Sequence, residues 1–112
     1  MDEFVRKAAA LGLPAIMLVI VMATTGLAGA AAITAALAAL GGPAGMLGGI
    51  AVLGMIGLAT EMLSKYGLEA LLIGIYKQRL QNGESKSRLC GEIRNLPISG
   101  EMKRKLDEEF GC

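Results

Sequence analysis

The hydrophobic pattern of this chain is dominated by one long stretch without charge. From Ala8 to Thr60 there are 53 consecutive positions, and none of them is Asp, Glu, Lys or Arg. A helix at the surface of a soluble domain needs a polar face toward water, so such a run is unusual there. About 20 apolar residues cross the hydrocarbon core of a bilayer. The stretch is therefore long enough for two membrane-spanning helices and too short for three.

A turn signal divides the uncharged stretch at residues 41–43, whose sequence is Gly-Gly-Pro. Gly suits the left-handed end of a helix, and Pro suits the first turn of the next one. The pattern predicts one helix over residues 14–40 and a second over residues 44–65, which ends at Tyr66 and Gly67. Because the connection is short, we expect the two helices to fold back as an antiparallel hairpin.

Helical spacing of apolar residues predicts three shorter helices in the rest of the chain. They cover residues 68–81, 84–95 and 100–110, and Ser99 is a suitable N-cap for the last one. The charged residues of the first of these helices, Arg79 among them, are placed off its apolar face. The residues expected to face inward are Leu68, Leu71, Leu72, Ile75, Tyr76, Leu80, Leu89, Ile93, Leu96, Met102, Leu106 and Phe110.

The chain is therefore expected to be all-α and to have two parts. Residues 1–66 form a membrane-inserted helical hairpin, and residues 67–112 form a C-terminal helical cap. The cap is too small to build much of a core alone, so we expect it to pack on the hairpin, on the membrane surface or on neighbouring subunits. Before the hairpin, residues 2–7 form a short lead-in in which Phe4 and Val5 face lipid.

Small side chains recur along both expected membrane helices. In lipid, helices associate through close packing, which small residues permit. The glycines of the second helix do not fall on one line at 100° per residue, so one partner helix cannot use them all. We therefore expect the hairpin to oligomerise, and the alternative that these residues only close the hairpin within one chain stays open. The expected packing residues are Gly26, Ala30, Thr34, Ala38, Gly45, Gly49, Gly54 and Gly57.

The basic residues determine the expected orientation in the membrane. Arg6 and Lys7 precede the hairpin, Lys65, Lys77 and Arg79 follow it, and the turn between the two helices carries no charge. The positive-inside rule then places both termini in the cytoplasm. We expect no cleaved signal peptide, because the first residues are partly acidic and the apolar stretch is far longer than the usual h-region.

The composition removes most catalytic and ligand-binding chemistry. The chain has no His, the commonest general base and metal ligand. Cys90 and Cys112 do not make a disulfide framework or a zinc site, so we expect Cys90 to be buried and Cys112 to be accessible and unpaired within the chain. An inert, frayed terminus is favoured for Cys112, and pairing between subunits is the alternative. A net charge of +1 gives no basic excess for nucleic-acid binding. We therefore expect no catalytic residue, cofactor, metal or nucleic-acid partner.

Part of the chain resembles the small Gly/Ala-rich interferon-inducible membrane proteins. The resemblance rests on residues 13–14 (Leu-Pro), 25–33 (TGLAGAAAI), 38–42 (AALGG) and 54–58 (GMIGL), which match a Pro-led apolar helix, a Gly-Gly break and a second Gly-rich helix. It covers residues 13–58 only. It implies a protein of intracellular membranes tied to cell death and antiviral defence, and it brings no catalytic residues.

Several classes of function remain open. The small size, the absent catalytic groups and the glycine faces favour a self-associating protein that permeabilises or remodels a bilayer, as a holin or a cell-death effector does. The alternative is a membrane-anchored adaptor or structural subunit that binds a protein partner through the helices from Glu84 to Phe110. An enzyme or small-molecule carrier is disfavoured, because only unclustered carboxylates and Lys remain for it. A soluble assembly that buries the apolar stretch between subunits is the last alternative.

Overall fold

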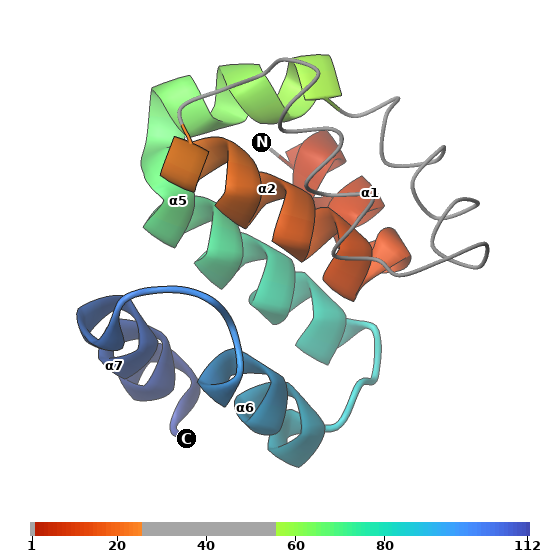
Figure 1. Cartoon of the computed structure of the whole chain (residues 1–112). Helices are drawn as coiled ribbons and strands as arrows, with labels where there is room; N and C mark the ends of the chain where they lie inside the picture. The colour runs from red at the N-terminus through yellow and green to blue at the C-terminus, as the bar shows by residue number, and fades with distance from the viewer. Residues whose placement is uncertain (1, 26–55) are drawn as a thin grey trace, which may run out of the picture.

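The computed structural model describes residues 2–25 and 56–112, which form helices joined by short turns (Figure 1). In chain order the helices are α1 (Asp2–Leu11), α2 (Leu13–Thr25), α5 (Ile56–Gln81), α6 (Lys86–Arg94) and α7 (Gly100–Phe110). No strand occurs in this part of the chain, which confirms its predicted all-α character.

A sharp corner joins α1 to α2. Gly12, at the corner, has a φ of 76°, and the two helices are bent by 120° from each other. Phe4 and Val5 of α1 are only 2% and 8% exposed, in a core shared with α2 and α5. The expectation that they face lipid is therefore wrong, because the lead-in is a helix whose apolar side packs inward.

Two helical arms make up α5. Gly67 lies between them with φ 83° and ψ 165°, which is not a helical conformation. Residues 56–66 form the first arm and residues 68–81 the second arm. The predicted break at Tyr66 and Gly67 and the predicted helix over residues 68–81 are thus both confirmed.

The expected membrane hairpin lies largely outside the described residues. α2 is described as far as Thr25 and α5 from Ile56, so the turn at residues 41–43 and the pairing of the two membrane helices stay predictions. Over residues 2–25 and 56–112, no single helix is both long and apolar enough to cross a bilayer. Only α1 and α2 taken together reach that length and composition, across their 120° corner.

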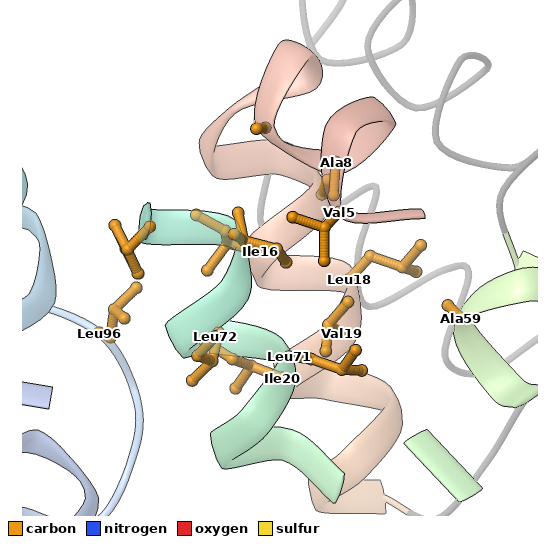
Figure 2. Close-up of a cluster of buried hydrophobic side chains, with 14 of the residues drawn as sticks. Val5, Ala8, Ile16, Leu18, Val19, Ile20, Ala59, Leu71, Leu72 and Leu96 are labelled. Carbon is orange, nitrogen blue, oxygen red and sulfur yellow. The ribbon is translucent and has the colours of Figure 1, made fainter. Parts of the chain in front are cut away.

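The core is formed where α1 and α2 pack on α5. Ile16, Val19 and Ile20 of α2 are no more than 2% exposed, and Figure 2 shows Val19 and Ile20 beside Leu71 and Leu72 of the second arm. Burial of each such side chain contributes roughly 1.5–3 kcal/mol. Leu71 and Leu72 belong to the expected cap and α2 to the expected hairpin, so one core joins residues from both parts.

The helices α6 and α7 pack on each other, and α7 also packs on α5 (Figure 1). Ser85 begins α6 and Ser99 begins α7, each as an N-cap whose hydroxyl accepts a backbone N–H. The predicted bounds of α7 are confirmed, and α6 is slightly shorter than predicted at both ends. Among the predicted inward residues of this region, five are buried and Met102 is partly buried against the core; the five are Leu89, Ile93, Leu96, Leu106 and Phe110.

Candidate functional site

The most unusual side chain in the described structure is a buried arginine. Arg79, near the end of the second arm, is 3% exposed. Its placement off the apolar face is therefore wrong. Arg79 follows Leu72 by seven positions, or about two helical turns, so both side chains lie on the same face. Helical spacing alone would have placed Arg79 inside, and its charge misled the sequence interpretation.

Two carboxylates bind the Arg79 guanidinium. Nε and Nη2 of Arg79 donate to the two Glu84 oxygens at 2.7 and 2.9 Å. Nη1 and Nη2 donate to the two Glu92 oxygens at 2.5 and 3.0 Å. Each carboxylate is therefore held in a bidentate pair, the strongest geometry available to arginine. Since Glu84 precedes α6 and Glu92 lies within it, Arg79 ties the end of α5 to α6.

Two aromatic rings complete the cluster. The Tyr76 hydroxyl donates to Oε1 of Glu92 at 3.0 Å, and the Arg79 guanidinium carbon lies 5.4 Å from the centre of the Tyr76 ring. Phe110 of α7 meets Tyr76 edge-on, with ring centres 6.1 Å apart. The Arg79 cluster, defined as Tyr76, Arg79, Glu84, Glu92 and Phe110, thus joins α5, α6 and α7.

The pKa shifts in the Arg79 cluster follow from burial and pairing. Burial raises the pKa of Tyr76 above its usual range, and the charge and hydrogen bond of Glu92 raise it further. Burial alone lowers the pKa of Arg79, but the hydrogen bonds to Glu84 and Glu92 outweigh it, so this pKa ends above its usual value. Hydrogen bonds from Arg79 hold the pKa of Glu84 below its usual range. All three shifts fix the existing protonation states, which suits a structural cluster and not an acid or base in turnover.

A disulfide closes the end of the cap. Cys90 of α6 is bonded to Cys112. The expected burial of Cys90 is confirmed at 6% exposure, but the expectation of an unpaired Cys112 is wrong. Gly111 adopts a left-handed conformation, and the Cys112 N–H donates to the Asp107 carbonyl at 2.9 Å. This turn brings Cys112 back toward α6.

The disulfide was missed because the two cysteines were assessed by their number and not by the fold between them. They lie 22 positions apart, one inside a helix and one just after a helix-terminating glycine. A link that closes a loop of this size stabilises a fold by about 3 kcal/mol in the chain-entropy description. It therefore matters for a cap with so small a core of its own.

A shallow hollow of about 120 Å³ lies between α5 and α7. It is lined by Glu69, Ser99, Glu101, Met102 and Lys105. Lys105 lies 3.6 Å from Glu69 and 3.7 Å from Glu101 across ion pairs, so the charged groups of this hollow already have partners. These pairs are about half exposed and contribute little to stability.

The predicted helix-packing residues are described at one position only. Gly26, Ala30, Thr34, Ala38, Gly45, Gly49 and Gly54 lie outside the described residues. Gly57 lies in α5, is exposed, and has open space where a Cβ would be. The packing interface therefore stays a prediction. In the part of the chain that the structure describes, no three potential ligands are grouped so as to hold a metal ion.

No known protein family, curated protein or solved structure matches this chain. The resemblance to the interferon-inducible membrane proteins stays a prediction from the sequence.

Proposed function

We propose that this chain is a membrane-inserted, self-associating protein that permeabilises or remodels a bilayer. The observation that carries the proposal is the uncharged stretch from Ala8 to Thr60. Residues 26–55 alone supply 30 consecutive uncharged positions, whereas one span needs about 20.

The helix α2 is suited to take part in insertion. It carries no charged residue on any face, and such a helix is stable inside a protein core or in lipid. In the described structure, most of its apolar residues lie in a core shared with α1 and α5, whereas Leu13 is 42% exposed. We propose that residues 26–55 form the inserted segment, and that α2 and the beginning of α5 lead into it while they keep their contacts with each other.

Vesicle leakage tests permeabilisation. The purified full chain is added to vesicles loaded with a quenched dye, and the same sample is floated on a density gradient. We expect the protein to float with the vesicles and release dye with a steeper than linear dependence on protein concentration. Protein that stays in the supernatant after a high-speed spin without detergent contradicts insertion. Protein that floats and oligomerises without releasing dye contradicts permeabilisation.

A glycine substitution tests self-association. Gly49→Leu places a bulky side chain in the predicted small-residue strip, and we expect at least a tenfold loss of dye release and smaller assemblies in detergent. Association is read from mass in detergent or from amine cross-linking, since the thiol of Cys112 is occupied. Gly91→Leu is the matched control, because Gly91 of α6 has open space at its Cβ position. Equal assembly sizes for the Gly49→Leu variant and the unmodified chain count against the glycine interface.

The cap favours a second candidate function, a membrane-anchored adaptor. The disulfide and the Arg79 cluster hold α6 and α7 in a fixed arrangement, and a preorganised surface loses less entropy when it binds a partner. In this case the region from Glu84 to Phe110 binds a protein partner. The vesicle experiment separates the two functions, because the adaptor floats with vesicles and leaves the dye inside.

A further inference from the structure

We infer that the cap and α1 both lie on the oxidising, non-cytoplasmic side of the membrane. The observation is the disulfide between Cys90 and Cys112. Disulfides form and persist in periplasmic, lumenal or extracellular surroundings, whereas cytoplasmic thiols are kept reduced. The inference rests on the membrane insertion proposed above and adds to it which compartment the folded cap faces.

Formation of the bond requires an oxidant that such a compartment supplies. The two thiols lose two protons and two electrons as the Sγ–Sγ bond forms. The acceptor is the disulfide of a thiol oxidoreductase, which is reduced to a dithiol by exchange through a mixed disulfide. Once the bond has formed, Cys90 is 6% exposed and Cys112 lies at the surface. A reductant therefore reaches the pair chiefly from the side of Cys112.

The packing of the helices places α1 in the same compartment. α1 packs directly on α5, and the second arm of α5 holds α6 through the bidentate pairs of Arg79. α7 packs on both α5 and α6. A membrane cannot pass between helices that share a core, so α1 and the cap lie on one side. Because α2 and α5 also pack on each other, the segment between Thr25 and Ile56 starts and ends at this same body.

This orientation is the reverse of the one that the basic residues favour. The positive-inside rule places Arg6, Lys7 and Lys65 in the cytoplasm, but it is a bias that added charges can change. The disulfide is a stricter condition, because a reducing compartment removes the bond chemically. We therefore give the disulfide precedence.

The redox state of the unmodified chain is the first test. Cells that express the full chain are quenched with acid, which stops thiol exchange, and the denatured protein is treated with a maleimide-polyethylene glycol. We expect no addition before reduction and two additions per chain after it. Two additions without reduction overturn the inference. Fractionation of the same cells tests membrane insertion separately. Protein found in the soluble fraction contradicts the proposed function, whatever the state of its thiols.

The sidedness of the cap is the second test. Cys90→Ser leaves Cys112 as a single exposed thiol, and a membrane-impermeant maleimide is applied to sealed cells or vesicles of known orientation. We expect nearly all of the labelling to occur from the non-cytoplasmic side. Labelling from the cytoplasmic side overturns the inference.

A matched variant tests α1. Lys7→Cys, in a chain with Cys90→Ser and Cys112→Ser, places one thiol at an exposed position of α1. We expect it to be labelled from the same side as Cys112. Labelling of the two positions from opposite sides contradicts the shared location of α1 and the cap. Should the cysteine variants fail to fold, the acid-quench result on the unmodified chain still decides whether the compartment is oxidising.

Discussion

Arg79 is the residue on which the end of α5 most depends. Its guanidinium is out of water at 3% exposure, and the side chains of Glu84 and Glu92 are 26% and 15% exposed. The three charges lose hydration on folding, and their bidentate contacts offset that loss. A buried ion cluster of this kind gives little net stability, but it is very sensitive to removal of one member.

Arg79→Ala should therefore be strongly destabilising. The substitution leaves two partly buried carboxylates without their cation, and we expect a loss of roughly 3–5 kcal/mol in the free energy of unfolding. Chemical denaturation followed by circular dichroism measures it. Arg104→Ala on the exposed face of α7 is the control, with an expected change within about 0.5 kcal/mol. Equal effects of the two substitutions are incompatible with a structural role for the cluster.

Tyr76 makes stability depend on pH in the alkaline range. Its pKa is higher in the folded chain than in the unfolded chain, so the folded state holds the proton more tightly. This contribution is fully present below about pH 10 and is lost as the pH rises above it, by up to roughly 1.4 kcal/mol per pH unit. The free energy of unfolding is measured at several pH values between pH 9 and about pH 11.5. It should fall more steeply with pH for the unmodified chain than for Tyr76→Phe. Parallel pH profiles would refute the assignment, since lysine titration is common to both proteins.

The partners of Arg79 were harder to predict than its burial. Its burial is a local property, because it follows from the spacing to Leu72 on one helix. Its partners are reached only after the chain turns between α5 and α6, which brings Glu84 and Glu92 back to it. No local pattern specifies that approach.

At the level of helices, local signals predicted most helix ends in the second half of the chain, whereas α6 was predicted to begin at Glu84, before its N-cap Ser85. Ser85 and Ser99 cap their helices through their own hydroxyls, and Gly67 ends a helical arm by its own conformation. Each signal acts within one or two turns, so it can be read without the fold. The inward packing of α1 could not be predicted in this way. Its short apolar side suits lipid or protein equally, and only the presence of α5 decides between them.

Gly67 gives a prediction at the same scale. Its φ of 83° and ψ of 165° lie in a region that residues with a Cβ avoid. Gly67→Ala should lower the free energy of unfolding by roughly 1–3 kcal/mol through backbone strain, although no atom lies within 4 Å of the added Cβ. Gly91→Ala in α6 has the same open surroundings and should be neutral or stabilising by up to about 1 kcal/mol. Thermal unfolding of the two variants compares them directly. An unchanged unfolding temperature for Gly67→Ala would contradict the expected backbone strain at residue 67.

For the whole molecule, the hydropathy pattern and the packed core concern largely different residues. The uncharged stretch predicted a membrane hairpin, and its central residues 26–55 lie outside the described structure. The described helices form one body in which α1, α2 and α5 share a core and α6 and α7 extend it. Sequence periodicity predicted the position of most of these helices. It did not predict the disulfide and the Arg79 cluster, because both join residues that are distant in the sequence.

The disulfide also makes residues 90–112 a covalent ring. The connection between α6 and α7 is exposed at Asn95, Pro97 and Ser99, and Arg94 just before it offers a cleavage site for trypsin. One cut at Arg94 opens the ring without releasing a fragment. We expect the nicked chain to migrate as one species on a non-reducing gel and as two after reduction, whereas a nicked Cys112→Ser chain separates in both gels. A protease that meets the folded cap would thus leave the segment after the cut attached to α6.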